Sequence, residues 1–163
     1  MKGPEVSLKH LQRALTMELT TVNTYLLQER KLDDWGIDRL AKRMREEIGE
    51  EREHANLYLS RLILLEGEPD VHTLDKIEQP KSVKNIFETQ LEMENEARAY
   101  YNKAARECEA AGDVGTFNLF MTILGDEEEH VDFCEEQLGL MEMLGDQLYI
   151  SRQVSSAAGE DEE

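Results

Sequence analysis

The sequence predicts an all-α protein: a four-helix bundle with a long crossover between its second and third helices and a short fifth helix. Only three prolines and ten glycines interrupt its 163 residues. Glu, Leu, Ala, Met and Gln are abundant, and these residue types lose little side-chain freedom in a helix. Apolar residues recur at spacings of three and four in four separate stretches, which is the period of an amphipathic helix.

Each helix has a recognisable start or stop. Pro4 suits the first turn of the first helix, and Gly67 with Pro69 ends the second. Ser82 is a candidate N-cap of the third helix, which stops at Gly112, and the fourth follows at once. The expected helices span residues 4–33, 37–65, 82–108, 114–141 and 146–153.

The connection 66–82 lacks apolar periodicity and is long enough to run the length of a bundle, so the second and third helices are expected to lie parallel. The short links elsewhere predict two antiparallel pairs. A chain of this size forms one core. We therefore expect one domain over residues 1–153, followed by a disordered acidic tail over 154–163.

The charge of the chain restricts its partners. Acidic residues outnumber basic ones by 36 to 18, giving a formal net charge of −18 that would repel nucleic acid. No apolar run is long enough for a membrane span, and no signal peptide is recognisable at Met1, so a cytoplasmic protein is expected. Cys108 and Cys134 fall on apolar helix faces and are predicted to be core thiols, while His10 is expected on an exposed helix surface and His72 in a loop.

A six-residue pattern occurs twice, over residues 49–54 and 125–130, and each copy contains Glu-x-x-His. These pairs are Glu51/His54 and Glu127/His130. Each copy has a distant partner at the same offset, since Glu18 precedes Glu51 by 33 positions (51 − 18) and Glu94 precedes Glu127 by 33 (127 − 94). The arrangement of one Glu followed 33 positions later by a Glu-x-x-His pair therefore occurs twice, at an offset of 76 (94 − 18). A duplicated metal half-site would have this pattern.

All six residues interrupt the apolar stripes that should face the core. An ionised carboxylate buried without a partner costs several kcal/mol, so four of them in one core must share a cation or bind protons. The i, i+3 spacing places Glu and His on one helical face, where both can bind the same ion. One Glu from each of two helices and a Glu-x-x-His from each of the other two is the di-iron carboxylate arrangement of a four-helix bundle.

A single Glu-x-x-His would be weak support in so acidic a chain, and the prediction depends on the two matched copies. Glu47 lies on the same seam of the second helix, and Asp126 precedes the second motif directly. Tyr25 and Tyr101 also differ by 76 (101 − 25). Core packing explains these two tyrosines as well as a position next to the ligands or a redox role does.

At these residues the chain resembles bacterioferritin, a branch of the ferritin family, along nearly its whole length. The segments 34–36 and 61–67 also look like sequence of that family, and His130 favours this branch over classical ferritins. The resemblance implies an iron-storing shell of 24 subunits in which each bundle is a ferroxidase that oxidises Fe(II) with O2 or H2O2. Its metal ligands, which are also the catalytic residues, would be Glu18, Glu51, His54, Glu94, Glu127 and His130, with Glu51 and Glu127 as bridges. Glu46 and Glu50 fall where the family can hold a further iron on the inner surface, and Tyr25, Glu47, Tyr101 and Asp126 would surround the ligands.

One position departs from the family. Haem-binding members have a methionine directly after the Glu of the first motif, and this chain has Arg52 there. A guanidinium offers no lone pair to iron. We therefore expect a shell without the usual bis-methionine haem, or a haem-free subunit that co-assembles with a haem-binding relative. Met44, on the same helix, is interpreted as a core residue.

Three alternatives remain at the level of sequence. One is a mainly structural or iron-release subunit of a mixed shell, and another is a rubrerythrin-like peroxidase, against which the presence of only two cysteines argues. The third, a DNA-protecting mini-ferritin, is disfavoured by the acidic tail. A ferredoxin-type protein is the expected reductant for iron release.

Overall fold

The computed structural model describes residues 1–155 and confirms the all-α bundle. Its elements are α1 (Glu5–Asp34), α2 (Asp38–Leu64), α3 (Val83–Ala110), α4 (Val114–Leu144) and α5 (Asp146–Ser151), and no strand occurs within this described part. The bounds lie close to the predicted ones. Among the described helices, none is both long and apolar enough to cross a lipid bilayer.

Local sequence fixes where the long helices begin and end. Ser82 caps α3 by accepting a 3.0 Å hydrogen bond from the Asn85 N–H, and Asp113 caps α4 by accepting one of 3.0 Å from the Thr116 N–H. The α2 helix ends three residues before Gly67, and Glu66 takes the left-handed conformation with φ +59°. Gly67 suits the close approach that follows, because a Cβ there would lie 3.0 Å from the Leu8 side chain and 3.2 Å from the Leu62 carbonyl oxygen, which is tighter than ordinary contact.

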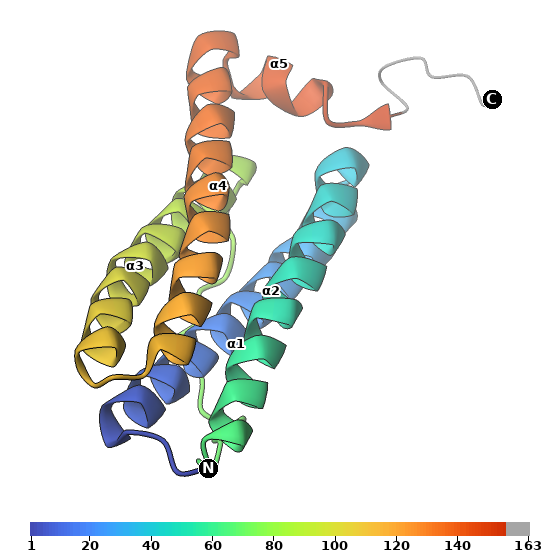
Figure 1. Cartoon of the computed structure of the whole chain (residues 1–163). Helices are drawn as coiled ribbons and strands as arrows, with labels where there is room; N and C mark the ends of the chain where they lie inside the picture. Colours follow the sequence, from blue (N-terminus) through green and yellow to red (C-terminus); the bar gives the residue numbers. More distant parts are fainter. Residues whose placement is uncertain (156–163) are drawn as a thin grey trace, which may run out of the picture.

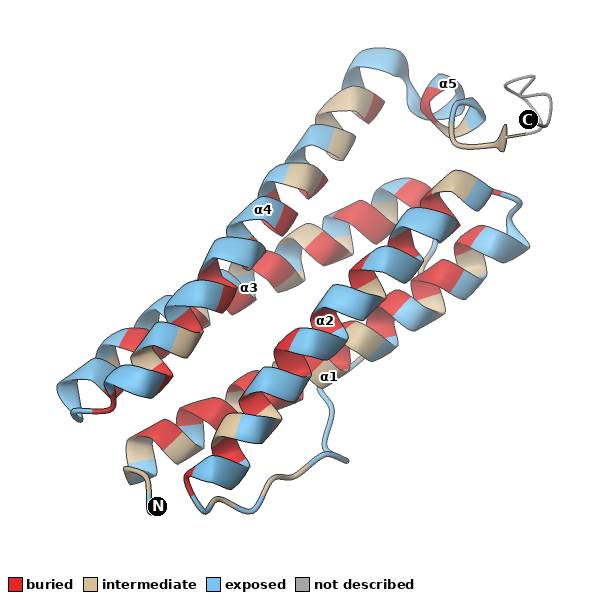
Figure 2. Ribbon diagram, turned by 45° about the vertical axis from the view of Figure 1, so that its right-hand side comes forward, coloured by how far each residue is buried: buried red, intermediate tan, exposed pale blue. Residues whose placement is uncertain are grey.

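The four long helices form two antiparallel pairs, α1 with α2 and α3 with α4, as predicted (Figure 1). The α1 helix also packs on α3, and α2 lies more loosely beside α4, so the α1/α3 side and the α2/α4 side are opposite faces of the bundle. The α2 and α3 helices run in the same direction (Figure 1). Buried residues form stripes along the helices where they face one another (Figure 2).

The connection between α2 and α3 runs along α1 and is bound to it. The side chain of Gln12 makes hydrogen bonds of 2.9 and 2.8 Å with the backbone of Asp70, and Arg13 donates one of 2.8 Å to Asp75. With α2, α3 and this connection around it, α1 is covered on a wide face. For that reason His10, predicted to be exposed, is only 4% exposed; that prediction was wrong because the periodicity of one helix does not report how many neighbours cover it.

Two apolar clusters fill the two halves of the bundle and leave a polar layer between them. One cluster lies nearer the N-terminus of α1 and includes Leu11, Tyr58 and Phe120. The other includes Met44 and Phe87, together with Cys134. Both cysteines are buried and free, as predicted for core thiols, and His72 is an exposed loop residue as predicted. The two clusters hold the polar layer in a fixed position.

The chain beyond α4 folds back across one end of the bundle. Tyr149 of α5 is buried edge-on against Phe87, with ring centroids 6.4 Å apart. The carbonyl oxygen of Gln153 accepts a 3.1 Å hydrogen bond from the Arg39 N–H, and the Ser155 N–H donates one of 3.0 Å to Asp38. Packing thus continues two residues beyond the predicted domain boundary at 153; the remainder of the predicted tail, 156–163, lies outside the described residues.

Candidate metal centre

The six residues singled out by the repeat converge in the polar layer between the two apolar clusters. Each of the four long helices contributes, and all six side chains are buried: Glu18 from α1, Glu51 and His54 from α2, Glu94 from α3, and Glu127 and His130 from α4. Because Glu and His are three residues apart on α2 and on α4, each pair projects from one helical face toward the bundle axis.

The six side chains form two overlapping groups of potential ligand atoms. In each group the atoms lie within 4.8 Å of one another, which is close enough to share one metal ion. The first group is Glu18, Glu51, His54 and Glu127, and the second is Glu51, Glu94, Glu127 and His130. Glu51 and Glu127 belong to both groups, so the geometry favours two neighbouring ions that share these two carboxylates.

The atoms that face the centre are poorly satisfied by the protein itself. Both carboxylate oxygens of Glu51 and of Glu127 are buried without a hydrogen-bond partner, and so is Nδ1 of each histidine. Nδ1 of His54 lies 3.4 Å from Glu51 and from Glu127, and Nδ1 of His130 lies 3.0 Å from Glu51. These contacts are not aligned as hydrogen bonds. Buried polar atoms without partners are costly, and carboxylate with imidazole is a donor set that iron accepts. The residues therefore fit a pair of metal ions.

Burial and mutual repulsion divide the four carboxyl groups into two kinds. Burial, with repulsion from Glu127 and Glu51, raises the pKa of Glu18 well above its usual range, and burial with repulsion from Glu51 does the same to the pKa of Glu94. Burial also opposes ionisation of Glu127, but His130 and His54 outweigh it and lower its pKa to about 2; the pKa of Glu51 is lowered in the same way.

The two histidines show the reciprocal shift. Burial opposes protonation of His54, but Glu127 and Glu51 outweigh it and raise its pKa to about 10. The same two carboxylates raise the pKa of His130 well above its usual range, also against burial. Without metal, two imidazolium groups therefore neutralise the two central carboxylates. Metal cations would replace these protons.

A further set of side chains contacts the six central residues. The Tyr101 hydroxyl donates a hydrogen bond to Glu18, and the Tyr25 hydroxyl donates one to Glu94. Asp126 lies 3.2 Å from Nε2 of His54, and Glu47 lies 3.4 Å from Nε2 of His130. The two tyrosines keep the offset of 76 (101 − 25), whereas Asp126 and Glu47 do not (126 − 47 = 79). The counterpart of Asp126 is Glu50 (126 − 50 = 76), which lies 3.3 Å from Nε2 of His130.

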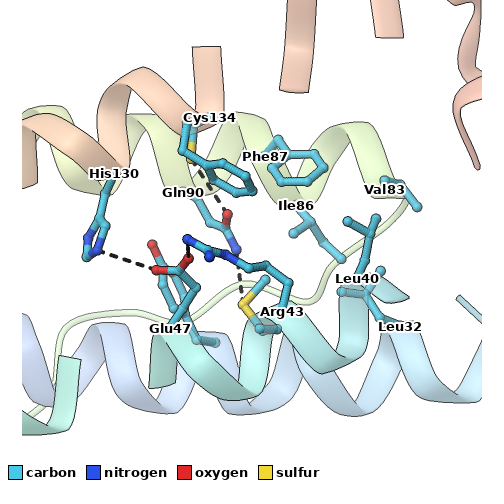
Figure 3. A pocket seen from close by; sticks show the side chains of 13 residues that line it. Leu32, Leu40, Arg43, Glu47, Val83, Ile86, Phe87, Gln90, His130 and Cys134 are labelled. Atoms are coloured by element: carbon cyan, nitrogen blue, oxygen red, sulfur yellow. Dashed lines mark hydrogen bonds and ion pairs between the residues drawn. The ribbon is translucent and has the colours of Figure 1, made fainter. Parts of the chain in front are cut away.

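Sequence reasoning missed Arg43, which pairs with Glu47 and packs 4.9 Å from the centroid of the Phe133 ring. Figure 3 shows Arg43 next to Glu47, with Glu47 facing His130. The i, i+4 spacing of Arg43 and Glu47 on a helix was the available signal.

Glu50, at 3.3 Å, is the second acidic neighbour of His130, and Glu47, Glu50 and His130 form a third potential metal group. Glu46, which the sequence paired with Glu50, is not in this group; it is exposed and lies 4.0 Å from Arg43.

The centre opens toward the α2/α4 side. A pocket of about 510 Å³ has His54 and His130 in its wall, so that the imidazoles lie between the pocket and the central carboxylates. Acidic side chains dominate the rest of this wall: Glu50, Glu53, Asp126 and Glu129, with Arg43 as the one cation among the described residues that line it. Such a pocket would concentrate divalent cations.

Arg52 lies in a separate surface pocket of about 520 Å³ on the α1/α2 side. Its wall includes Leu19, Gly49 and Val71, and no methionine is among its described lining residues. Met44, in contrast, is a buried core residue whose sulfur accepts a 3.4 Å hydrogen bond from Gln90.

Comparison with known proteins agrees with this geometry. The ferritin-like domain family matches residues 8–144. The bacterioferritin of Brucella melitensis is 41% identical over 91% of this chain and 92% of its own length, and that of Rhodobacter capsulatus is 37% identical over 90% and 91%. A solved Mycobacterium tuberculosis bacterioferritin superposes with a TM-score of 0.94 at 33% identity, covering 96% of this chain and 98% of that one.

The solved structure of Rhodobacter capsulatus bacterioferritin superposes with a TM-score of 0.93 at 35% identity, covering 95% of this chain and 97% of that one. It is described as having a metal-free dinuclear site and a haem iron on a crystallographic special position. Sequence, fold and buried carboxylate–histidine cluster thus agree, and this chain belongs to the ferritin family, in its bacterioferritin branch.

Proposed function

We propose that this protein stores iron and is a ferroxidase, oxidising Fe(II) at the centre inside each bundle before the ferric product is stored in a hollow shell. Membership of the bacterioferritin branch supports iron storage and assembly into a multimeric shell. The observation that carries the ferroxidase proposal is the pair of overlapping groups that share Glu51 and Glu127. Iron enters this reaction as the substrate and supplies the electrons that O2 or H2O2 accepts.

Each residue has a distinct task in this proposal. Glu51 and Glu127 bridge the two ions, Glu18 with His54 completes one ion's ligands, and Glu94 with His130 completes those of the other. Glu18 and Glu94 release their protons when the cations bind, because positive charge nearby removes the repulsion that raised their pKa values. Asp126 and Glu50, the hydrogen-bond partners of Nε2 of His54 and of His130, orient the two imidazoles, which leaves Nδ1 directed at the ions.

The acidic pocket on the α2/α4 side is the proposed route between the centre and the shell interior. Glu50 lies at the pocket wall and also within 3.3 Å of His130, so an ion held there would be one short step from the centre. We propose Glu50 with Glu47 as the inner-surface iron ligands, and Glu46 as an outlying acidic residue.

The haem of the family does not fit this chain at the expected position. Arg52 offers no lone pair, and no methionine lines its pocket among the described residues. We propose a 24-subunit shell that lacks bis-methionine haem when built from this chain alone. The Arg52 pocket also favours a second candidate role, that of a haem-free subunit assembling with a methionine-bearing relative; mass measurement of native shells separates the homomer from the mixed shell.

Direct measurement of Fe(II) oxidation tests the proposal. Purified shells receive two Fe(II) per subunit without oxygen, and Fe(III) formation is followed after mixing with O2 or, separately, with H2O2. Combined Glu18→Ala and His130→Ala substitutions should abolish the fast phase, while Glu92→Gln, an exposed carboxylate on α3, should leave it unchanged. Wild-type kinetics in the double variant would refute the proposed site. No fast phase in the wild-type homomer, with metal binding intact, would favour a structural or iron-release subunit.

A further inference from the structure

A chain of hydrogen-bonded and stacked side chains leads away from the metal centre on the side opposite the acidic pocket. It begins at Tyr101, whose hydroxyl donates to Glu18 and whose side chain is completely buried. The ring of Tyr100 lies edge-on to the ring of Tyr101, with centroids 6.3 Å apart. The Tyr100 hydroxyl lies 2.8 Å from Nδ1 of His10, and Nε2 of His10 lies 2.7 Å from Glu107.

The protonation pattern of this chain follows from its chemistry. The side chain of Glu107 is 44% exposed, and the hydrogen bond from His10 lowers the pKa of its carboxyl group. A carboxylate only accepts hydrogen bonds, so Nε2 of His10 carries the hydrogen, and in the neutral ring Nδ1 is then the acceptor of the Tyr100 O–H. Burial raises the pKa of Tyr100 to about 12, which keeps the phenol protonated at neutral pH. The Tyr100 hydroxyl is therefore already hydrogen-bonded to a base, Nδ1 of His10, that can accept its proton.

Only one half of the repeat carries this extension. Tyr25 is the counterpart of Tyr101, since 101 − 25 gives the offset of 76, and it contacts Glu94 in the same way. The counterpart of Tyr100 is Thr24 (100 − 24), whose hydroxyl donates to the carbonyl of Thr20 on its own helix. The Tyr25 half therefore packs in the bundle with Thr24 bonded to its own helix, so packing around the centre does not by itself require the extension through Tyr100 and His10.

The chain runs toward the opposite face of the protein from the acidic pocket. His10 belongs to α1 and Glu107 to α3, so their pair joins the two helices that lie opposite the α2/α4 opening. His10 is eight positions from Glu18, or about 12 Å along the helix axis at the usual rise per residue. The chain of side chains through Tyr100 and His10 and the acidic pocket therefore reach the centre from opposite sides.

We infer that Tyr101 and Tyr100 form a redox relay that supplies a single electron to peroxide when the centre holds one Fe(II) instead of two, with His10 as the proton acceptor. This inference rests on the proposed function. Hydrogen peroxide needs two electrons, and one ferrous ion supplies only one, so the remaining oxidising equivalent would otherwise leave as a hydroxyl radical. The relay provides the second electron from inside the protein.

The step balances as follows. The O–O bond of H2O2 breaks to give two hydroxide ions, with one electron from Fe(II), which becomes Fe(III), and one from Tyr100 passed through the Tyr101 ring. The Tyr100 O–H proton moves along its existing hydrogen bond to Nδ1 of His10, which leaves a neutral tyrosyl radical and an imidazolium paired with Glu107. A second Fe(II) ion, arriving later, returns one electron, and the proton moves back from His10.

Electron paramagnetic resonance tests the inference directly. Anaerobic protein carrying one Fe(II) per subunit is mixed with one equivalent of H2O2 and frozen, and both Fe(III) and organic radical are measured in the same samples. The wild type should give a tyrosyl signal. Tyr100→Phe and Tyr101→Phe should each lower its yield at least fivefold, while Tyr149→Phe, a buried tyrosine of α5 bonded to Gln137, should leave it unchanged.

The matched variants separate a relay from a packing role. Co(II) binding of two ions per subunit in Tyr100→Phe and Tyr101→Phe would show that the centre is intact, since Phe preserves the ring packing. His10→Gln should shorten the lifetime of the radical, because the amide cannot take up the proton. In metal-free protein, nitrogen magnetic resonance of labelled histidine should show Nε2–H and a bare Nδ1 for His10, and the reverse tautomer would overturn the inference.

The outcomes also distinguish the two proposals. Fe(III) formation without a tyrosyl signal in the wild type, or an unchanged signal in Tyr100→Phe, overturns the relay and leaves the ferroxidase proposal standing. Absence of Fe(III) formation in the wild type overturns both.

Discussion

The sharing of Glu51 and Glu127 makes metal stoichiometry a quantitative test of the centre. Glu18 belongs to one of the two four-residue groups, whereas Glu51 belongs to both. Glu18→Gln should therefore remove a ligand from a single ion, and the protein should bind one Co(II) per subunit tightly instead of two. Glu51→Gln should weaken both ions. Isothermal titration of metal-free protein with Co(II) measures the stoichiometry.

The loss of one Co(II) site instead of both also predicts a measurable difference in the free energy of unfolding. At free Co(II) one hundred times the dissociation constant, each occupied site adds roughly 2.7 kcal/mol to the free energy of unfolding, so two sites add roughly 5.4 kcal/mol. Glu18→Gln should halve the metal-induced rise in melting temperature. Without metal the substitution should have little effect, because burial and repulsion from Glu127 and Glu51 disfavour the ionised Glu18 carboxyl group and an amide has nearly the shape of its neutral form.

Glu92→Gln is the matched control, since it makes the same substitution at an exposed position of α3 and should retain two ions and the full thermal shift. Two tightly bound Co(II) ions in Glu18→Gln, with the wild-type thermal shift, would contradict the assignment of Glu18 to one ion. Loss of both ions in Glu18→Gln would contradict the sharing of the bridging carboxylates.

Four further outcomes are expected. The raised pKa of His54, about 10 against an unperturbed 6.5, means that its stabilising protonation is complete below about pH 6.5 and is lost as pH rises through about 10; melting curves of metal-free protein should show stability falling over that window, and a flat profile would contradict it. Burial raises the pKa of the Cys134 thiol to about 12, so mass spectrometry after iodoacetamide at neutral pH should find this residue unmodified until the protein is unfolded, whereas rapid labelling of the native state would be inconsistent with its burial. Phe120→Ala should lower the free energy of unfolding by roughly 3–5 kcal/mol, because Phe120 is completely buried between Tyr58 and Tyr101; denaturant titration giving under roughly 1 kcal/mol would show that the cavity collapses. Homomeric wild-type shells should lack an intense Soret band and Arg52→Met should gain one on adding haem, and stoichiometric haem in the wild type would refute the role given to Arg52.

The helices and the six central residues could be predicted because each depends on local sequence. Capping residues such as Ser82 act on their own turn, and apolar periodicity marks which face of a helix is covered. The duplicated motif added long-range information, because an equal offset between Glu18/Glu51 and Glu94/Glu127 ties four helices into one plan without any structure. The sequence by itself thus determined the bundle and the candidate ligands.

Contacts between helices were decided only by the tertiary structure. The sequence placed Tyr25 on the same helix as Glu18, but in the bundle its hydroxyl meets Glu94 of α3, while Tyr101 of α3 meets Glu18. It expected His10 on the surface, and the packing of α3 on α1 buried it between Tyr100 and Glu107. Which side chain lies across from another depends on the rotation and height of each helix, which result from the packing of the whole core and not from the period of one segment.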